Sequence, residues 1–146
     1  MPQQRYLGVD LGTRRIGVAV SDELGLTAQP LPTLEPPTED GALVAIRGLI
    51  DRYGVQEVVI GLPKNMNGTL GPAAEKALAF ARRLEEGSLA KVTMWDERLT
   101  SQAAERLLIE ADVRRAKRRR AIDQIAAVLI LQGFLDRRRH QEDRPS

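Results

Sequence analysis

The most informative stretch of the chain reads Tyr6-Leu7-Gly8-Val9-Asp10-Leu11-Gly12-Thr13-Arg14-Arg15-Ile16-Gly17-Val18-Ala19-Val20. Two apolar runs, residues 6–11 and 16–20, stand on either side of a polar segment that begins with Gly12. Short apolar runs separated by a glycine-containing turn are typical of a β-hairpin. The sequence therefore predicts that the chain opens with two paired strands.

Downstream of this hairpin, strand-like and helix-like patterns alternate. A third strand is expected at residues 26–34, where Pro30 and Pro32 favour a sheet edge because proline cannot donate a ladder hydrogen bond. Helical spacing and apolar runs predict helices over residues 41–53 (with Asp40 as N-cap), 72–86, 100–108 and 122–134, and strands over 55–62 and 91–95. This order implies an α/β fold, a central mixed five-stranded sheet flanked by helices.

Length and composition are typical of a globular protein. The chain has 146 residues, of which 42% are hydrophobic and 29% charged. We expect a single domain over residues 1–138 and a frayed charged tail over residues 139–146. The absence of cysteine excludes disulfides and thiolate metal sites, and no apolar stretch approaches the roughly 20 residues of a membrane span. We expect a cytoplasmic protein with no membrane partner.

Basic residues are concentrated in two segments, although the net charge is only +2. Most positions in residues 114–120 are cationic, and a second run follows at residues 137–139. Clustered cations indicate a polyanionic partner, because each neutralised phosphate releases condensed counterions. A solvated surface segment is the alternative. We expect Arg118, Arg119 and Arg120 to contact nucleic-acid phosphates.

Asp10 interrupts the apolar run of the first strand. A carboxylate buried there would be costly without a cation or hydrogen-bond donors. Gly8 and Gly12 stand two residues to either side and share its face, where they would leave room for a ligand or phosphate. Asp10 is thus a candidate metal ligand, and the alternative is a strand-end carboxylate that accepts turn N–H bonds.

A second acidic site, Asp96-Glu97, follows the fifth expected strand. Open α/β sheets bind ligands at the carboxyl ends of their strands. Because side chains alternate across a sheet, only one of the two acids can share the face of Asp10. We favour Glu97 as the ligand and Asp96 as a supporting partner, although the sequence leaves the reverse open. Arg98 and Thr100 come next and are candidate phosphate contacts.

Asp123 stands at the start of the last expected helix, where the helix dipole favours an anion. Ala127 and Ile130 share its helical face, which turns Asp123 toward the sheet. Acids from two strands and one helix form an oxygen-only donor set, which suits Mg²⁺ or Mn²⁺. Asp10, Glu97 and Asp123 are therefore candidate catalytic and metal-binding residues.

The loop after the buried fourth strand reads Pro63-Lys64-Asn65-Met66-Asn67-Gly68-Thr69. Lys64 and Asn65 offer a cation and an amide for phosphate contacts at a strand's carboxyl end. The alternative is a turn that uses Asn and Gly for backbone reasons only. No aromatic cluster suited to base stacking is evident, so we expect contacts to phosphates rather than to bases.

Four ordered motifs carry a resemblance to a known family. They are Gly8-Val9-Asp10-Leu11-Gly12-Thr13-Arg14-Arg15-Ile16-Gly17-Val18-Ala19, Val59-Ile60-Gly61-Leu62-Pro63, Asp96-Glu97-Arg98-Leu99-Thr100-Ser101 and Asp123-Gln124-Ile125-Ala126-Ala127. Over nearly the whole chain they resemble the YqgF/RuvX family, described as pre-16S rRNA nucleases or RuvC-like Holliday junction resolvases. The resemblance implies an RNase H-like nuclease fold with catalytic acids at Asp10, Glu97 and Asp123. RuvC-type resolvases usually assemble four carboxylates, but the position three after Asp123 is Ala126, which leaves open whether one or two metal ions bind.

The expected function is hydrolysis of nucleic-acid phosphodiesters by a metal-activated water, with structured RNA or branched DNA as partner. We favour processing of the 5′ end of pre-16S rRNA in ribosome biogenesis by a monomer or weak homodimer. Symmetric resolution of a Holliday junction needs a two-fold dimer, whereas every strong apolar stripe is needed to cover the sheet. The alternatives are a Holliday junction resolvase in DNA recombination and repair, and a non-catalytic nucleic-acid-binding assembly factor.

Overall fold

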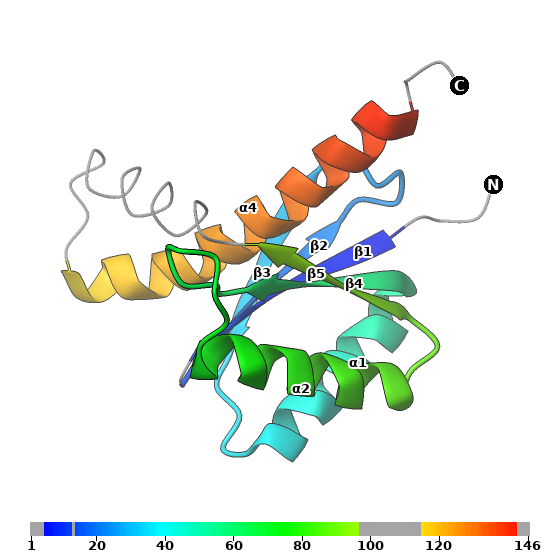
Figure 1. Ribbon diagram of the computed structural model, residues 1–146. Helices are drawn as coiled ribbons and strands as arrows, with labels where there is room; N and C mark the ends of the chain where they lie inside the picture. Colours follow the sequence, from blue (N-terminus) through cyan, green and yellow to red (C-terminus); the bar gives the residue numbers. More distant parts are fainter. Residues whose placement is uncertain (1–4, 13, 97–114, 143–146) are drawn as a thin grey trace.

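Five strands form one mixed sheet in the order β3-β2-β1-β4-β5, with helices on both faces (Figure 1). The structure, a computed structural model, describes residues 5–12, 14–96 and 115–142, with side chains in the last range only for residues 125–141. The strands are β1 (Arg5–Leu11), β2 (Ile16–Ser21), β3 (Ala28–Leu34), β4 (Val55–Leu62) and β5 (Lys91–Asp96). The predicted α/β fold with a mixed five-stranded sheet is confirmed.

The opening hairpin is confirmed as well. β1 and β2 pair antiparallel, with Asp10 opposite Gly17. β3 pairs antiparallel with β2 and forms one edge of the sheet. Pro30 and Pro32 lie in this edge strand, as the sequence predicts, because an edge strand can leave one row of backbone donors without ladder partners.

β4 and β5 extend the sheet on the other side of β1, and both run parallel to it. Val9 pairs with Ile60, which in turn pairs with Met94. The carboxyl ends of β1, β4 and β5 therefore meet at the same edge of the sheet, the edge at which α/β proteins bind ligands.

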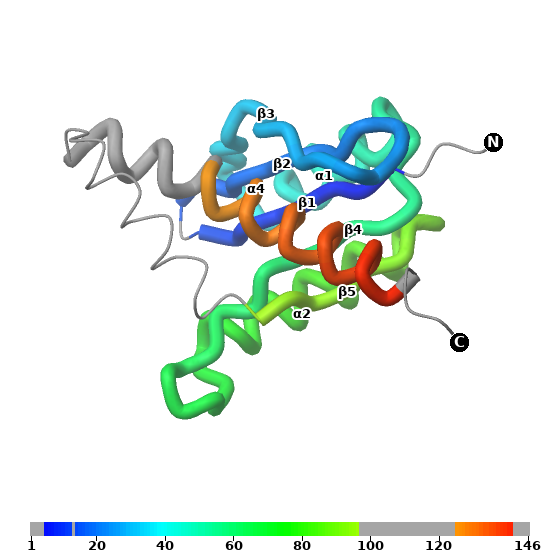
Figure 2. Tube along the Cα trace, turned by 90° about the horizontal axis from the view of Figure 1, so that it is seen from above, coloured from blue at the N-terminus to red at the C-terminus, as the bar shows by residue number. Residues whose placement is uncertain are grey.

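The helices cover the sheet unequally. Of the described helices, α1 (Glu39–Tyr53) and α2 (Pro72–Glu86) lie on one face and α4 (Arg115–Glu142) crosses the other, as Figures 1 and 2 show from two directions. No helix in the described ranges is long and apolar enough to cross a membrane.

The start of α1 differs from the prediction by its capping residue. Thr38 is the N-cap, and its Oγ1 accepts a hydrogen bond from the Gly41 N–H at 3.0 Å. Asp40, the predicted cap, lies inside the first turn and accepts a hydrogen bond from Arg83 of α2. This hydrogen bond raises the pKa of the Arg83 guanidinium above its ordinary value. The prediction for α2 is confirmed, with Pro72 in its first turn.

α4 is longer at both ends than predicted. It begins inside the basic segment, so residues 115–120 are helical; Arg and Lys are good helix formers. It also includes residues 139–142, which the sequence predicts to fray, and there Arg139 Nη2 contacts Asp136 Oδ1 at 3.0 Å. The helix expected at residues 100–108 lies outside the described residues.

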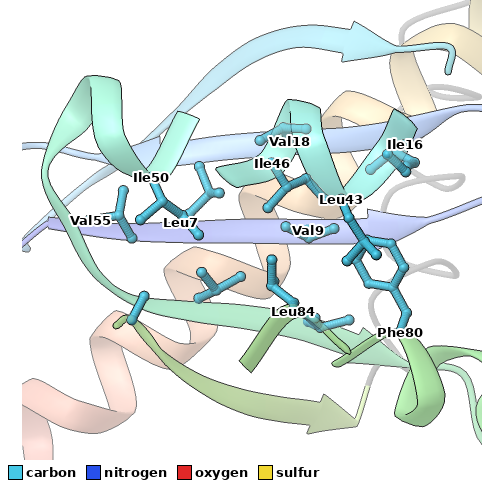
Figure 3. Packing of buried hydrophobic residues seen from close by; sticks show 14 of the residues in the cluster. Leu7, Val9, Ile16, Val18, Leu43, Ile46, Ile50, Val55, Phe80 and Leu84 are labelled. Carbon is cyan, nitrogen blue, oxygen red and sulfur yellow. The ribbon is translucent and has the colours of Figure 1, made fainter. Parts of the chain in front are cut away.

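The larger core lies between the sheet and the pair α1 and α2 (Figure 3). It is mainly aliphatic, and Leu7, Val9 and Val18 of the sheet and Ile46 and Leu84 of the helices are fully buried. Each side chain of this kind stabilises the folded chain by roughly 1.5 to 3 kcal/mol. A smaller cluster lies between the other face and α4, and its members are Tyr6, Ala19, Val59, Ala127, Ile130, Leu131 and Leu135.

Candidate active site

Asp10 lies near the carboxyl end of β1 and is partly exposed. Side chains alternate along β1, and Tyr6 belongs to the cluster under α4, so Asp10 faces α4. On one side its neighbour is Gly17 of β2, and on the other side Gly61 follows Ile60. Because neither glycine has a side chain, the carboxylate of Asp10 has room on both neighbouring strands.

Gly8 of β1 and Gly12, which directly follows β1, do not provide this room, which corrects the prediction. A Cβ on Gly8 would lie 2.7 Å from the Leu131 Cβ and 2.9 Å from the Ala127 carbonyl oxygen, so α4 occupies that space. A Cβ on Gly12 would lie 2.5 Å from the Arg15 carbonyl oxygen, which accepts the Gly12 N–H within the hairpin turn. Both glycines therefore serve close backbone packing.

Asp96 lies on the other face of the sheet. It pairs in the sheet with Leu62, whose side chain packs with Ala74 of α2. Its Oδ2 is 4.0 Å from the Lys64 Nζ. Asp96 thus neighbours the loop that follows β4 and does not share the face of Asp10. Glu97, the favoured ligand, lies outside the described residues.

The helical face that contains residue 123 is the one that packs on the sheet. Ala127 and Ile130 share this face, and both are fully buried in the cluster under α4. Both residues therefore face the sheet as expected, and the orientation of Asp123 stays a prediction. Asp123 itself belongs to α4, but its side chain lies outside the described residues.

The loop after β4 is closed by its own hydrogen bonds. Asn65 N–H donates to the Thr69 carbonyl oxygen at 2.9 Å, and Asn65 Nδ2 donates to Thr69 Oγ1 at 3.0 Å. Gly68 adopts φ 85°, a left-handed conformation that favours glycine. The Asn and Gly content thus has a backbone role, and Lys64 is the loop's cation at the carboxyl edge of the sheet.

The other predicted phosphate contacts lie in parts of the chain for which the structure describes the backbone only or nothing. Arg118, Arg119 and Arg120 lie in the first turns of α4, which extend past the sheet in Figure 1. Their side chains lie outside the described residues. Arg98 and Thr100 lie outside them altogether.

The structure brings together an aromatic cluster that the sequence analysis missed. The Phe134 ring contacts Tyr6 with centroids 5.7 Å apart and Trp95 edge-on with centroids 6.4 Å apart. These residues come from α4, β1 and β5, so no spacing in the sequence connects them. Two signals were available: Trp95 directly precedes the acidic pair, and Gly133 interrupts an apolar helix.

The donor chemistry fits a hard divalent cation. Asp10 offers carboxylate oxygens, the chain has no cysteine, and its single histidine, His140, is exposed near the end of α4. Among the described side chains, which do not include those of Glu97 and Asp123, no three Asp, Glu, His or Cys residues are grouped to hold a metal ion.

The sheet order and the position of α4 on the Asp10 face, as seen in the described ranges, define an RNase H-like fold. The structure is similar to that of Thermus thermophilus RuvC in complex with a Holliday junction substrate, with a TM-score of 0.60, 14% identity and coverage of 94% of this chain and 96% of that chain. The fowlpox virus Holliday junction resolvase gives a TM-score of 0.55 at 17% identity, covering 92% of this chain and 99% of that chain.

The sequence comparisons identify the family within this fold. A family model described as "RuvX: Holliday junction resolvase" matches residues 4–137. A protein of Geobacillus kaustophilus named "Putative pre-16S rRNA nuclease" is 58% identical over 137 residues, which cover 92% of this chain and 99% of that protein. A Clostridium kluyveri protein of the same name is 50% identical, covering 91% of this chain and 97% of that protein. The chain belongs to the RuvX family.

Proposed function

We propose that the chain is a metal-dependent nuclease that hydrolyses RNA phosphodiesters and processes the 5′ end of pre-16S rRNA. The observation that carries this proposal is Asp10, a carboxylate opposite Gly17 and one residue beyond the Val9–Ile60 pair, at the carboxyl edge of the parallel strands. Membership of the RuvX family supports the nuclease activity. The names of the relatives from Geobacillus and Clostridium support the RNA substrate.

The register of β5 supports Glu97 as the second acid. Trp95 packs in the cluster under α4, whereas Asp96 lies on the α2 side next to Lys64. If the strand alternation continues, the position after Asp96 returns to the face of Asp10.

The direction of α4 supports Asp123 as the third acid. Phe134 packs near the start of β1 and Ala127 lies on Gly8, so α4 runs opposite to β1. Asp123 stands four residues, about 6 Å along the helix axis, before Ala127. Asp10 stands two strand residues, roughly 6.6 Å, beyond Gly8. These two displacements are similar in length and point the same way, which favours a position of Asp123 close to Asp10.

The metal would be Mg²⁺ or Mn²⁺, held by Asp10, Glu97 and Asp123. When bound, such an ion supplies an activated water and neutralises charge that develops on the phosphate. The carboxylates of the chain fix its position on the α4 face of the sheet, where the glycines beside Asp10 leave space for a phosphodiester.

Cationic and polar side chains around this edge would hold the nucleic-acid backbone. Lys64, whose Nζ lies near Asp96, would bind phosphates next to the carboxylates, together with Asn65, Arg98 and Thr100. The basic first turns of α4, with Arg118, Arg119 and Arg120, would bind phosphates farther along the substrate. Such contacts position the strand without reading its sequence.

The distribution of apolar surface favours a monomer or a weak homodimer. A Holliday junction presents two equivalent strands, so a resolvase acts as a two-fold dimer with a self-complementary patch. The apolar faces of α1, α2 and α4 are instead occupied by the sheet. Trimming one end of an RNA needs only one active site.

A cleavage panel tests this function. Pre-16S leader RNA, unstructured single-stranded RNA and a four-way DNA junction are incubated with the full chain and Mg²⁺ or Mn²⁺. The matched control is Asp96→Asn, which removes a neighbouring carboxylate on the other face of the sheet. We expect cleavage of the leader RNA that is lost in Asp10→Asn and largely retained in Asp96→Asn.

Three results would contradict the proposal. Symmetric cutting of the junction by a stable dimer, without cleavage of the leader, would identify a resolvase instead. Tight RNA binding without cleavage under any metal condition would identify a non-catalytic assembly factor. Cleavage that survives Asp10→Asn would show that the site lies elsewhere.

A further inference from the structure

A groove lies between β5 and the C-terminal half of α4, on the same face of the sheet as Asp10. Its volume is about 370 Å³, and its lining includes Lys91, Trp95, Phe134, Arg137 and Arg138. β5 is the last strand of the described sheet, so the groove follows the sheet's edge. The groove brings together two cations of the run at residues 137–139, Arg137 and Arg138, with Trp95 and Phe134 of the aromatic cluster, and the proposed catalytic site uses none of these four side chains.

This groove continues toward the proposed active site. A second cavity of about 300 Å³ shares Trp95 and Arg137 with the groove and reaches Lys64 and Asp96 at the carboxyl edge. Trp95 pairs with Gly61, the glycine beside Asp10, so Trp95 stands two strands from Asp10. At a strand spacing of about 4.8 Å, this places the two strands roughly 10 Å apart.

The charge of the groove favours an anionic occupant. Lys91 and Arg137 are exposed, and the Arg138 guanidinium lies 5.0 Å from the centroid of the Tyr6 ring. The carboxylate in the described lining is that of Glu57, which accepts a hydrogen bond from Thr93 Oγ1 at 2.6 Å. Three cations therefore face one carboxylate.

Trp95 is held in place from the helix side. Its indole lies edge-on to Phe134, at an interplanar angle of 85°. A Cβ on Gly133 would lie 3.0 Å from Trp95 Cζ2, so the indole packs directly on the α4 backbone. The ring is nevertheless only partly buried. A rigid, partly exposed aromatic side chain beside cations is the arrangement that single-stranded nucleic-acid sites use for base stacking.

We propose that this groove binds a single-stranded nucleic-acid segment that leads into the active site. One base stacks on Trp95, and Lys91 and Arg137 bind the flanking phosphates. The inference rests on the proposed nuclease function and adds to it a requirement for an unpaired strand next to the cut. A peptide strand added to the edge of β5 is disfavoured, because a lysine on an edge strand opposes pairing with another strand.

The single tryptophan of the chain makes the test specific to this groove. A labelled single-stranded RNA of about eight nucleotides, within the site sizes of single-strand-binding folds, is titrated into the full chain carrying Asp10→Asn. Label anisotropy gives the affinity, and tryptophan emission reports the environment of Trp95. We expect quenching with the single strand and none with a duplex of the same sequence.

Variants in the same background assign the affinity to the groove. The double variant Lys91→Ala, Arg137→Ala should bind about tenfold more weakly near 0.1 M salt, and its log-log salt slope should fall by about 1.4, or 0.7 per lost contact. Trp95→Phe, which keeps an aromatic ring against Phe134, should bind about fivefold more weakly. The control Arg139→Ala removes a cation that pairs with Asp136 and does not line the groove, so it should bind as the parent does.

The outcomes separate this inference from the proposed function. Unchanged emission together with unaltered affinity in the groove variants would overturn the groove, even if the wild-type chain cleaves RNA. Equal quenching by the duplex would overturn the single-strand requirement. Emission that depends on protein concentration without RNA would show that β5 pairs with a second copy. Quenching in the Asp10→Asn chain, together with no cleavage by the wild-type chain under any metal condition, would support the groove and refute the nuclease.

Discussion

The two faces of the sheet are built in different ways. The face under α1 and α2 holds the larger cluster, in which aliphatic side chains such as Ile46 and Leu84 are fully buried (Figure 3). The face under α4 holds a smaller cluster, in which glycines at two positions, Gly8 and Gly133, let the helix and the sheet approach closely. Asp10 lies on this second face.

The first face therefore contributes most to the stability of the fold, and the second face determines the geometry around Asp10. On the first face, the volume of buried side chains sets the distance between helix and sheet. On the second face, Gly8 sets it, because the α4 backbone rests where a side chain would stand. Gly8 lies two residues before Asp10, so it also fixes how closely α4 approaches that carboxylate. The geometry of the proposed active site therefore depends more on the close contact between Gly8 and the α4 backbone than on the packing of large side chains.

The largest effect is expected on catalysis alone. Asp10→Asn keeps the shape of the side chain and removes its charge, so the cleavage rate should fall by roughly 1,000-fold, or about 4 kcal/mol in the activation barrier. Because Asp10 is partly exposed, the free energy of unfolding should change by less than about 0.5 kcal/mol. Single-turnover cleavage and urea denaturation of the same preparation measure the two effects. A free energy of unfolding that falls by as much as the activation barrier rises would make Asp10 a structural residue.

The next effect belongs to the opposite face. Ile46→Ala leaves a cavity in the larger core and should lower the free energy of unfolding by about 3 kcal/mol. The control Val44→Ala, at a position of α1 that is 68% exposed, should change it by less than about 0.5 kcal/mol. Equal effects of the two variants would contradict the described packing of α1. The rate per folded molecule should stay unchanged in both.

A smaller loss of stability is expected at the α4 contact. Gly8→Ala places a Cβ against the Ala127 carbonyl oxygen and should destabilise the chain by about 2 kcal/mol through overpacking. Unlike Ile46→Ala, it should also lower the cleavage rate of the folded protein, because α4 must shift away from β1. The control Gly48→Ala, whose Cβ would meet nothing within 4 Å, should stabilise by up to about 1 kcal/mol. A tolerated alanine at both positions would refute the role of Gly8.

The smallest effect concerns the second glycine contact. Gly133→Ala gains helix propensity of up to about 1 kcal/mol but pushes a Cβ against Trp95, so the net change in stability should be under about 1 kcal/mol. The emission of Trp95 should nevertheless change, because the indole must move. Emission identical to that of the wild-type chain would show that the indole does not depend on this contact.

Local patterns predicted most of the strands. Apolar runs located β1, β2 and β4, and Pro30 and Pro32 placed β3 at an edge, because these signals act within one strand. The ends of elements were harder to predict. Thr38 and Asp40 are both good capping residues two positions apart, and the structure distinguishes them: Thr38 accepts the Gly41 N–H, whereas the Asp40 carboxylate contacts Arg83 of α2.

The candidate site was predictable from the sequence where the alternation of side chains along a strand alone decides which face of the sheet a residue occupies. Strand periodicity places Asp10 on the face of the sheet under α4 and Asp96 on the opposite face. The observed pairing of the strands agrees with both positions. The role of Gly8 was not predictable, because a glycine in a strand leaves the same sequence signal whether a ligand or a helix approaches it. The contact of Trp95 with Phe134 joins residues far apart in the chain, so only the tertiary structure shows it.

The central claim is that Asp10, Glu97 and Asp123 hold a divalent cation on the α4 face of the sheet. Calorimetric titration of Mn²⁺ into the wild-type chain and into Asp10→Asn, Glu97→Gln and Asp123→Asn measures this most directly. The control is Asp96→Asn, whose carboxylate lies on the opposite face beside Lys64.

We expect each of the three variants to weaken Mn²⁺ binding by at least about 100-fold. This exceeds the usual effect of mutating a residue that only hydrogen-bonds to a metal ligand. Asp96→Asn should stay within about threefold of the wild-type affinity. Wild-type affinity in all three variants, or a loss in Asp96→Asn as large as that in Asp10→Asn, would contradict this assignment of the site.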